Sequence, residues 1–184
     1  MEERKPAITI SGPPGSGTTT AARLIAAQTG LDYVNTGSIF RQMASEYQMS
    51  RGEFGAYVAG HPQIDQQLDL RQVELARHGG IILEGRLAGL LAQRDHIRAF
   101  TLFLNTDVGE RARRCSQRDE QNIMQAARLM AEREQLERER FLKLYGLDLA
   151  DTSGYNMVID SGAYLPEAIA MMVVTAYNKW NNHG

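Results

Sequence analysis

Cysteine is almost absent from this 184-residue chain, and the lone Cys115 cannot form a disulfide within one molecule. The sequence also lacks the Cys/His spacing of a zinc site and any apolar run long enough to span a membrane. Its first residues, MEERKPAITI, lack the apolar stretch of a signal peptide. The formal net charge of −2 gives no basic field for nucleic acid. These absences predict a cytoplasmic protein that binds neither membrane nor nucleic acid.

Lysine is the second scarcity, because the chain has 17 arginines but only three lysines, Lys5, Lys143 and Lys179. Arginine keeps its charge at any accessible pH and binds phosphate through two parallel hydrogen bonds. No lysine lies between Lys5 and Lys143, so any cationic chemistry in that long span belongs to arginine.

Strand-like and helix-like segments alternate along the chain, which predicts an α/β fold with a parallel sheet covered on both faces. The length suits one domain. Strands are expected at Ala7–Ser11, Asp32–Asn35, Gly80–Glu84, Phe100–Leu104 and Met157–Ile159. Helices are expected at Thr18–Gln28, Ser38–Tyr47, Arg51–Ala59, Gln63–His78, Asp107–Arg118, Asn122–Leu144 (one helix or two) and Pro166–Trp180. Two helical segments, 38–78 and 118–140, exceed ordinary crossovers and are interpreted as small inserted lobes.

A glycine-rich loop follows the first expected strand and opens the first helix. It reads Gly12, Pro13, Pro14, Gly15, Ser16, Gly17, Thr18, Thr19 and Thr20. The phosphate-binding pattern G-x-x-x-x-G-K-[ST] is matched except that Thr18 replaces the lysine. Backbone N–H groups and the helix N-terminus still form an anion site, and Thr19 retains the hydroxyl that ligates magnesium. The loop therefore predicts phosphate binding with one positive charge missing.

Four further segments follow the loop along the chain: YVNTGSIFRQMA, IILEGRLAG, REQLERERF and YGLD. Together with the loop they resemble the archaeal-type cytidylate kinases, a branch of the nucleoside monophosphate kinases within the P-loop NTPase fold. The resemblance covers about residues 8–159. It implies a three-layer α/β/α core with a five-stranded parallel sheet, formed by residues 1–37, 79–117 and 141–184. It also implies a monophosphate-binding lobe at 38–78 and a mobile lid at 118–140.

The resemblance implies roles for individual residues. The loop residues, together with Arg114 and Arg118, would bind ATP. The acceptor monophosphate would be held by Ser38, Arg41 and Arg86, with Asp65 and Arg71 beside its base. Arg133 and Arg140, seven positions apart on one helix face, would close over the moving phosphoryl group with Arg86 and act as catalytic arginines. Mg²⁺ would be held by Thr19 and, through water, by Glu84.

The reaction implied is transfer of the γ-phosphoryl group from ATP to CMP, and to dCMP, by a monomeric enzyme of pyrimidine nucleotide metabolism. Two alternatives stay open. The same fold could serve another acceptor, such as AMP, UMP or a small metabolite, or the chain could be a nucleotide-binding module without turnover. The cation that replaces the lysine is expected among Arg114, Arg118, Arg133 and Arg140.

Overall fold

A computed structural model describes residues 4–183 apart from 51–52, 55–56 and 59. Its central sheet holds five parallel strands in the order β2-β3-β1-β4-β5. These are β1 (Ala7–Ser11), β2 (Asp32–Asn35), β3 (Ile81–Glu84), β4 (Ala99–Asn105) and β5 (Met157–Asp160). All five predicted strands are confirmed, with ends shifted by no more than one residue. Strands β1 and β3 are buried throughout and most of their residues are apolar, as expected for a sheet covered on both faces.

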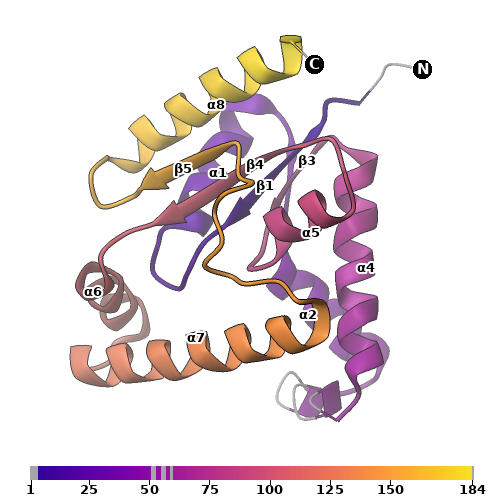
Figure 1. The fold of residues 1–184 in the computed structure, drawn as a ribbon. Helices are drawn as coiled ribbons and strands as arrows, with labels where there is room; N and C mark the ends of the chain where they lie inside the picture. Colours follow the sequence, from indigo (N-terminus) through magenta and orange to yellow (C-terminus); the bar gives the residue numbers. More distant parts are fainter. Residues whose placement is uncertain (1–3, 51–52, 55–56, 59, 184) are drawn as a thin grey trace.

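Helices cover both faces of this sheet, giving the three predicted layers (Figure 1). One face carries α1 (Thr18–Thr29) and α8 (Pro166–His183), which pack on each other and on the central strands. The other carries α4 (Pro62–His78) and α5 (Ala88–Arg94). In the described part of the chain, no helix has the length and apolar character needed to cross a membrane.

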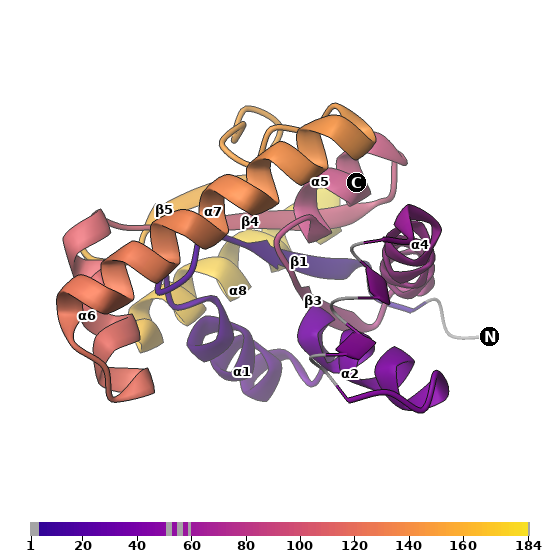
Figure 2. The ribbon, with the colours of Figure 1, turned by 90° about the horizontal axis from the view of Figure 1, so that it is seen from below.

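Two helical connections contain the segments that were predicted as inserted lobes. The first, α2 (Thr36–Glu46) and α4, connects β2 to β3, and the second, α6 (Val108–Asp119) and α7 (Ile123–Tyr145), connects β4 to β5. However, α4 of the first packs on the sheet, and α6 of the second lies mostly before residue 118. The predicted helix Arg51–Ala59 falls largely outside the described residues. Residues 123–145 form one continuous helix of 23 residues, which settles the choice between one helix and two. Figure 2 shows α7 running past the sheet between α6 and α4.

Local signals account for most helix ends. Gly30 ends α1 in the left-handed conformation, with φ +71°, and donates its N–H to the Ala26 carbonyl. Asp107 caps α6 by accepting the N–H groups of Gly109 and Glu110. The Glu110 carboxylate does not complete a capping box, because it accepts hydrogen bonds from Arg113 and Arg114 instead. The predicted start of this helix at residue 107 is confirmed, with Asp107 as its N-cap.

The short helix α5 was not predicted. Five of its seven residues are buried, so it has no polar face to reveal a helical period.

Candidate active site

The glycine-rich loop occupies the turn between β1 and α1, at the carboxyl edge of the sheet. Gly15 and Gly17 have φ values of +80° and +87°, a conformation that side chains rarely adopt. A Cβ at Gly12 would overlap the Leu104 carbonyl, and one at Gly15 would lie 2.6 Å from the Arg111 carbonyl. Glycine is therefore required at both positions, because the loop packs against the backbone of β4 and α6.

A cleft of about 980 Å³ opens above this loop. Its walls include all the predicted loop residues except Ser16, namely Gly12, Pro13, Pro14, Gly15, Gly17, Thr18, Thr19 and Thr20. Ser16 is buried beneath the loop, and its hydroxyl has no hydrogen-bond partner among the described residues. Its side chain therefore does not face the cleft, and its backbone N–H donates to the Pro13 carbonyl at 3.2 Å.

Thr18 and Thr19 both direct their hydroxyls at one carboxylate. Each Oγ1 lies 2.7 Å from Glu84 Oε1 at the end of β3. The other carboxylate oxygen accepts hydrogen bonds from the Tyr33 hydroxyl and, at 2.6 Å, from Asn35 Nδ2. Burial, followed by the hydrogen bond to Glu84, raises the pKa of Tyr33 to about 12, so the phenol stays protonated and donates. Glu84 is thus held by four side chains beneath the loop.

The donor atoms of this cluster suit a hard divalent cation. Mg²⁺ prefers oxygen ligands and is usually held by one or two protein oxygens plus substrate phosphates. The hydroxyl of Thr19 and the carboxylate of Glu84 meet that description at 2.7 Å from each other. Within the described residues, no group of three or more His, Cys, Asp or Glu side chains could form a metal cage. The site fits a cation that arrives with a phosphate ligand.

Arginines are the dominant charged side chains of the cleft. The arginines that line it are Arg23, Arg41, Arg86, Arg114, Arg118, Arg133 and Arg140. Five of these have a carboxylate partner, and no ion pair is found for Arg23 or Arg41 among the described residues. Positive charge from α1, α2, the turn after β3, α6 and α7 therefore converges on one space, as binding of a polyphosphate requires.

Arg86 joins the phosphate loop to α7. Its Nη1 donates to the Gly12 carbonyl at 2.7 Å, and its Nε lies 2.9 Å from the Glu137 carboxylate on α7. Glu137 also pairs with Arg133, at 2.8 Å. Burial lowers the pKa of Arg86, yet the group remains charged because arginine starts so high. Arg86 Nη2 is buried without a hydrogen-bond partner among the described residues, so it has a donor to offer a ligand.

The helix α6 holds two further predicted arginines beside the loop. Arg114 Nη1 lies 3.4 Å from the Gly15 carbonyl, and its Nη2 donates to the Ser161 carbonyl at 3.1 Å. Arg118 pairs with Asp119 at 2.7 Å and is largely exposed. Both line the cleft, and their role in ATP binding stays a prediction.

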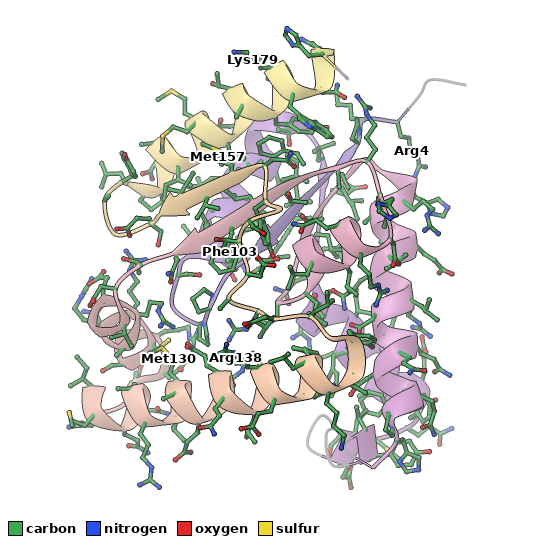
Figure 3. The ribbon with its side chains drawn as sticks, viewed as in Figure 1. Arg4, Phe103, Met130, Arg138, Met157 and Lys179 are labelled. Atoms are coloured by element: carbon green, nitrogen blue, oxygen red, sulfur yellow. The ribbon has the colours of Figure 1, made fainter. Side chains whose placement is uncertain are left out.

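Arg133 and Arg140 of α7 both line the cleft, as their shared helix face predicted. Arg140 forms an ion pair with Asp65 on α4. Arg138 lies between them on α7 (Figure 3). It pairs with Asp148 at 2.9 Å and is not among the residues that line the cleft. At the other end of α7, Met130 packs against Ala112 and Cys115 of α6 (Figure 3). α7 thus connects α6, which holds the loop, to α4.

Three predicted acceptor-site residues do not reach the cleft wall. Arg71 forms a bidentate pair with Glu46, at 3.0 and 2.7 Å, on the outer side of α4. Ser38 is exposed and donates to the Asn35 carbonyl at 2.6 Å. Asp65 is buried behind its ion pair with Arg140. Position 71 cannot share the face of positions 65, 69 and 72, because an α-helix turns 100° per residue.

Two residues that sequence reasoning missed line the cleft instead of Asp65 and Arg71. These are Asp69 and Gln72, which are 6% and 3% exposed. Asp69 accepts hydrogen bonds from Gln72 Nε2 at 2.8 Å and from the Tyr145 hydroxyl at 2.5 Å. A sequence signal existed, because Asp65, Asp69 and Gln72 form a polar stripe at i, i+4 and i+7 on a face that is otherwise apolar.

Glycine-rich loop, Thr19, Glu84 and converging arginines surround one cleft at the carboxyl edge of a parallel sheet, where ligands of open α/β sheets bind. This combination of fold and site defines a P-loop kinase. The model of the cytidylate kinase-like family matches residues 7–163. The chain belongs to that family.

Known cytidylate kinases are similar to this chain over nearly its whole length. The chain is 40% identical to the cytidylate kinase of Pyrococcus horikoshii over 176 residues, which is 96% of this chain and 90% of that protein. It is 40% identical to the cytidylate kinase of Methanocaldococcus jannaschii over 170 residues, 92% of this chain and 96% of the relative. Alignment over nearly the whole of both chains leaves no large part unmatched.

Solved structures that resemble this one include other small P-loop kinases. A shikimate kinase from Acinetobacter baumannii superposes with a TM-score of 0.62 at 14% identity, over 96% of this chain and 95% of that chain. A gluconokinase from Sinorhizobium meliloti gives a TM-score of 0.54 at 14% identity, over 100% and 97%. At such low identity these likenesses concern the fold alone.

Proposed function

We propose that this protein transfers the γ-phosphoryl group of ATP to CMP, and to dCMP, giving ADP and the corresponding diphosphate. The observation that carries this is the single cleft in which the phosphate loop and arginines from both inserted segments face one another. The relatives named cytidylate kinase, at 40% identity over most of the chain, favour CMP as the acceptor.

We assign a separate role in the reaction to each of the two helical segments and to the core. We assign residues 38–78 to acceptor binding, through Arg41 with Arg86, and residues 118–140 to a lid that carries Arg133 and Arg140. The remaining residues form the core and bind ATP through the loop, Arg114 and Arg118. Ser38, Asp65 and Arg71 are left out of direct contact with the acceptor, since their side chains lie outside the cleft wall. A cytoplasmic monomer stays a prediction of the sequence.

The chemistry requires positioning and charge rather than a base. An oxygen of the CMP phosphate attacks the γ-phosphorus, the bond to the β–γ bridging oxygen breaks, and ADP leaves with the electron pair. The attacking oxygen is already anionic, so no side chain has to remove a proton. Arg86, Arg133 and Arg140 would neutralise the equatorial oxygens as α7 excludes water. Thr19 and, through water, Glu84 would hold Mg²⁺, which when bound neutralises charge on the β- and γ-phosphates.

Two arginines are placed to supply the charge that Thr18 lacks. Arg86 Nη1 lies 2.7 Å from the Gly12 carbonyl, and Arg114 Nη1 lies 3.4 Å from the Gly15 carbonyl. Arg114 was among the residues expected from the sequence to replace the lysine, whereas Arg86 was expected to hold the acceptor phosphate and to act as a catalytic arginine. We assign the missing role to this pair, because both guanidinium groups already touch the loop.

A coupled assay of ADP release across CMP, dCMP, UMP, AMP and GMP tests the proposal. We expect turnover with CMP and dCMP to exceed turnover with the other three acceptors. Faster turnover with AMP or UMP would reassign the acceptor while keeping the reaction. Calorimetric ATP binding without turnover of any acceptor would instead support a nucleotide-binding module.

A further inference from the structure

A pair of buried polar side chains on α4, Asp69 and Gln72, faces the cleft between apolar walls. The two lie three positions apart on one helix face. The same cleft is lined by the apolar side chains Phe40, Leu68, Leu87 and Phe141. An apolar slot with a few convergent polar groups suits a flat heterocyclic ring, whose faces pack on the walls while its edge meets the polar pair.

Both side chains can form further hydrogen bonds, Asp69 as an acceptor and Gln72 as a donor. The Asp69 carboxylate accepts from Gln72 Nε2 and from the Tyr145 hydroxyl, and two of its roughly four lone-pair sites remain. Because a carboxylate only accepts, it orients the Gln72 amide nitrogen toward itself. Gln72 Nε2 then has a second N–H to donate. Side by side, the pair offers one acceptor and one donor.

The pair is located at the acceptor end of the cleft rather than at the ATP end. A Cβ on Gly85, which directly precedes Arg86, would lie 3.1 Å from Gln72 Oε1. Asp69 is tied by Tyr145 to the C-terminal end of α7, whereas the N-terminal half of α7 packs on α6, which contacts the phosphate loop. Figure 1 shows α4 and α6 at opposite ends of α7.

We propose that Asp69 and Gln72 read the edge of the acceptor base, with Asp69 accepting from the 4-amino group of cytosine and Gln72 donating to N3. This assignment rests on the proposed function and adds its specificity determinant. Tyr145 holds the Asp69 carboxylate in place and is a positioning residue.

Uracil presents the reverse pattern, because O4 is an acceptor and N3–H is a donor. Both of its groups would meet a group of the same kind, and a buried polar group without a partner is costly. Adenine shares the amino and ring-nitrogen pattern of cytosine, so the pair selects amino-bearing bases. Rejection of AMP then depends on the size of the slot.

The electrostatic state of Asp69 agrees with this role. Burial raises the pKa of Asp69 to about 6, with opposing contributions from Tyr145, Arg140 and Arg94 and a further rise from Asp65. The group is therefore mostly ionised at neutral pH, yet it lacks a direct cationic partner among the described residues. A donor from a bound base would relieve that desolvation.

The test combines one variant with one altered substrate. The substrates are CMP, UMP and the CMP analogue with a pyrimidin-2-one base, which lacks the 4-amino group. For the wild type we expect kcat/KM for CMP to exceed that for the analogue by about 10- to 100-fold, the usual range for a charged hydrogen bond. In Asp69→Asn this preference should shrink to within about threefold, through loss of CMP activity rather than gain of analogue activity. The KM for ATP should not change.

Glu74→Gln is the matched control, because it removes an exposed carboxylate from the same helix and should keep the wild-type preference. If Asp69→Asn fails to fold, the base-reading role can still be tested with Gln72→Met and with the wild-type comparison of CMP and its analogue. A wild type that phosphorylates CMP and the analogue equally well would overturn the base-reading role and leave the kinase standing. A wild type that phosphorylates no monophosphate would overturn the kinase proposal, and the base-reading role with it.

Discussion

The two sides of the cleft differ in the groups they present, because the ATP side offers backbone groups and the acceptor side offers side chains. On the ATP side, the loop offers backbone N–H groups and is shaped by glycines that pack on the backbone of β4 and α6. On the acceptor side, α2, α4 and α7 offer side chains, and most of these are engaged with one another through ion pairs such as Arg140–Asp65. The backbone side should tolerate changes of side-chain charge but no added Cβ, and the side-chain side should behave in the opposite way.

The ion pairs add a second contrast. Arg86 and Arg133 share Glu137, and Arg140 pairs with Asp65, so each of these three arginines has a carboxylate partner. Phosphate oxygens would have to replace those carboxylates when substrates bind. The loop needs no such exchange, because its N–H groups are already directed by the backbone.

The largest expected effect is that of Gly12→Ala. The new Cβ would overlap the Leu104 carbonyl and crowd the Ser16 hydroxyl, so strand β4 or the loop must shift. We expect a loss of about 3 kcal/mol in the free energy of unfolding and no measurable ATP binding by calorimetry. Gly30→Ala is the control, since only its positive φ opposes a Cβ, at about 1 kcal/mol, and ATP binding should persist. Normal ATP affinity in Gly12→Ala would contradict the backbone account.

Arg86→Ala should have the next largest effect, because Arg86 contacts both the phosphate loop, at Gly12, and α7, at Glu137. Loss of its charged hydrogen bonds should lower kcat/KM for CMP about a hundredfold, and Arg41→Ala should lower it about tenfold or more. Arg138→Ala, which removes only an exposed pair with Asp148, should leave steady-state kinetics within twofold, or about 0.4 kcal/mol. Unchanged kinetics in both Arg41→Ala and Arg86→Ala would remove the acceptor-phosphate assignment.

The contribution of Asp69 to the stability of the protein should fall as pH rises from about 4 to about 6. Asp69 binds its proton more tightly in the folded state, where its pKa is about 6, than in the unfolded chain, where it is near 3.8. The favourable contribution is therefore complete below pH 4 and is lost by pH 6, and its size is up to about 3 kcal/mol. Asp65 shifts in the same direction, also through burial.

Chemical denaturation of wild type and Asp69→Asn across pH 4–7 measures how the free energy of unfolding depends on pH. The variant should show a much flatter profile and should equal or exceed the wild type in stability at pH 7. A steep fall that persists in Asp69→Asn would place the responsible group elsewhere.

The lid arginines should show a smaller and more selective effect. Arg133→Ala and Arg140→Ala should each lower kcat about tenfold while changing ATP affinity less, because their contacts strengthen as the lid closes on the transition state. Arg140→Ala should also destabilise the protein, since it leaves the Asp65 carboxylate buried without its partner. Weaker ATP binding with an unchanged kcat would make them ordinary binding residues.

Thr18→Lys should have the smallest effect, about tenfold or less in kcat in either direction. The new ammonium group would lie beside Glu84, to which Thr18 now donates, in a loop that Arg86 and Arg114 already contact. Single-turnover rates of the two proteins with CMP provide the measurement. A sharp gain in activity over an inert wild type would show that these arginines do not replace the missing lysine.

Much of the fold and one side of the site were predictable because their signals are local. Most of the strands are short and mainly apolar segments, and such a segment can be recognised without knowledge of the rest of the chain. The phosphate loop is likewise a contiguous segment whose function depends on backbone conformation. α5 escaped prediction for the converse reason, since burial on all sides erases the helical period.

What the sequence by itself determined, therefore, was the alternation of elements, the phosphate loop with its missing lysine, and the helix face shared by Arg133 and Arg140. Tertiary structure alone decided that Arg86 touches Gly12, 74 positions away, and that Asp69 and Gln72 face the cleft while Arg71 faces outward. Every arginine carries the same charge, and which one meets a phosphate depends on where the sheet order and the course of α7 bring its helix. Contacts between segments far apart in the chain set that geometry, and no local pattern encodes them.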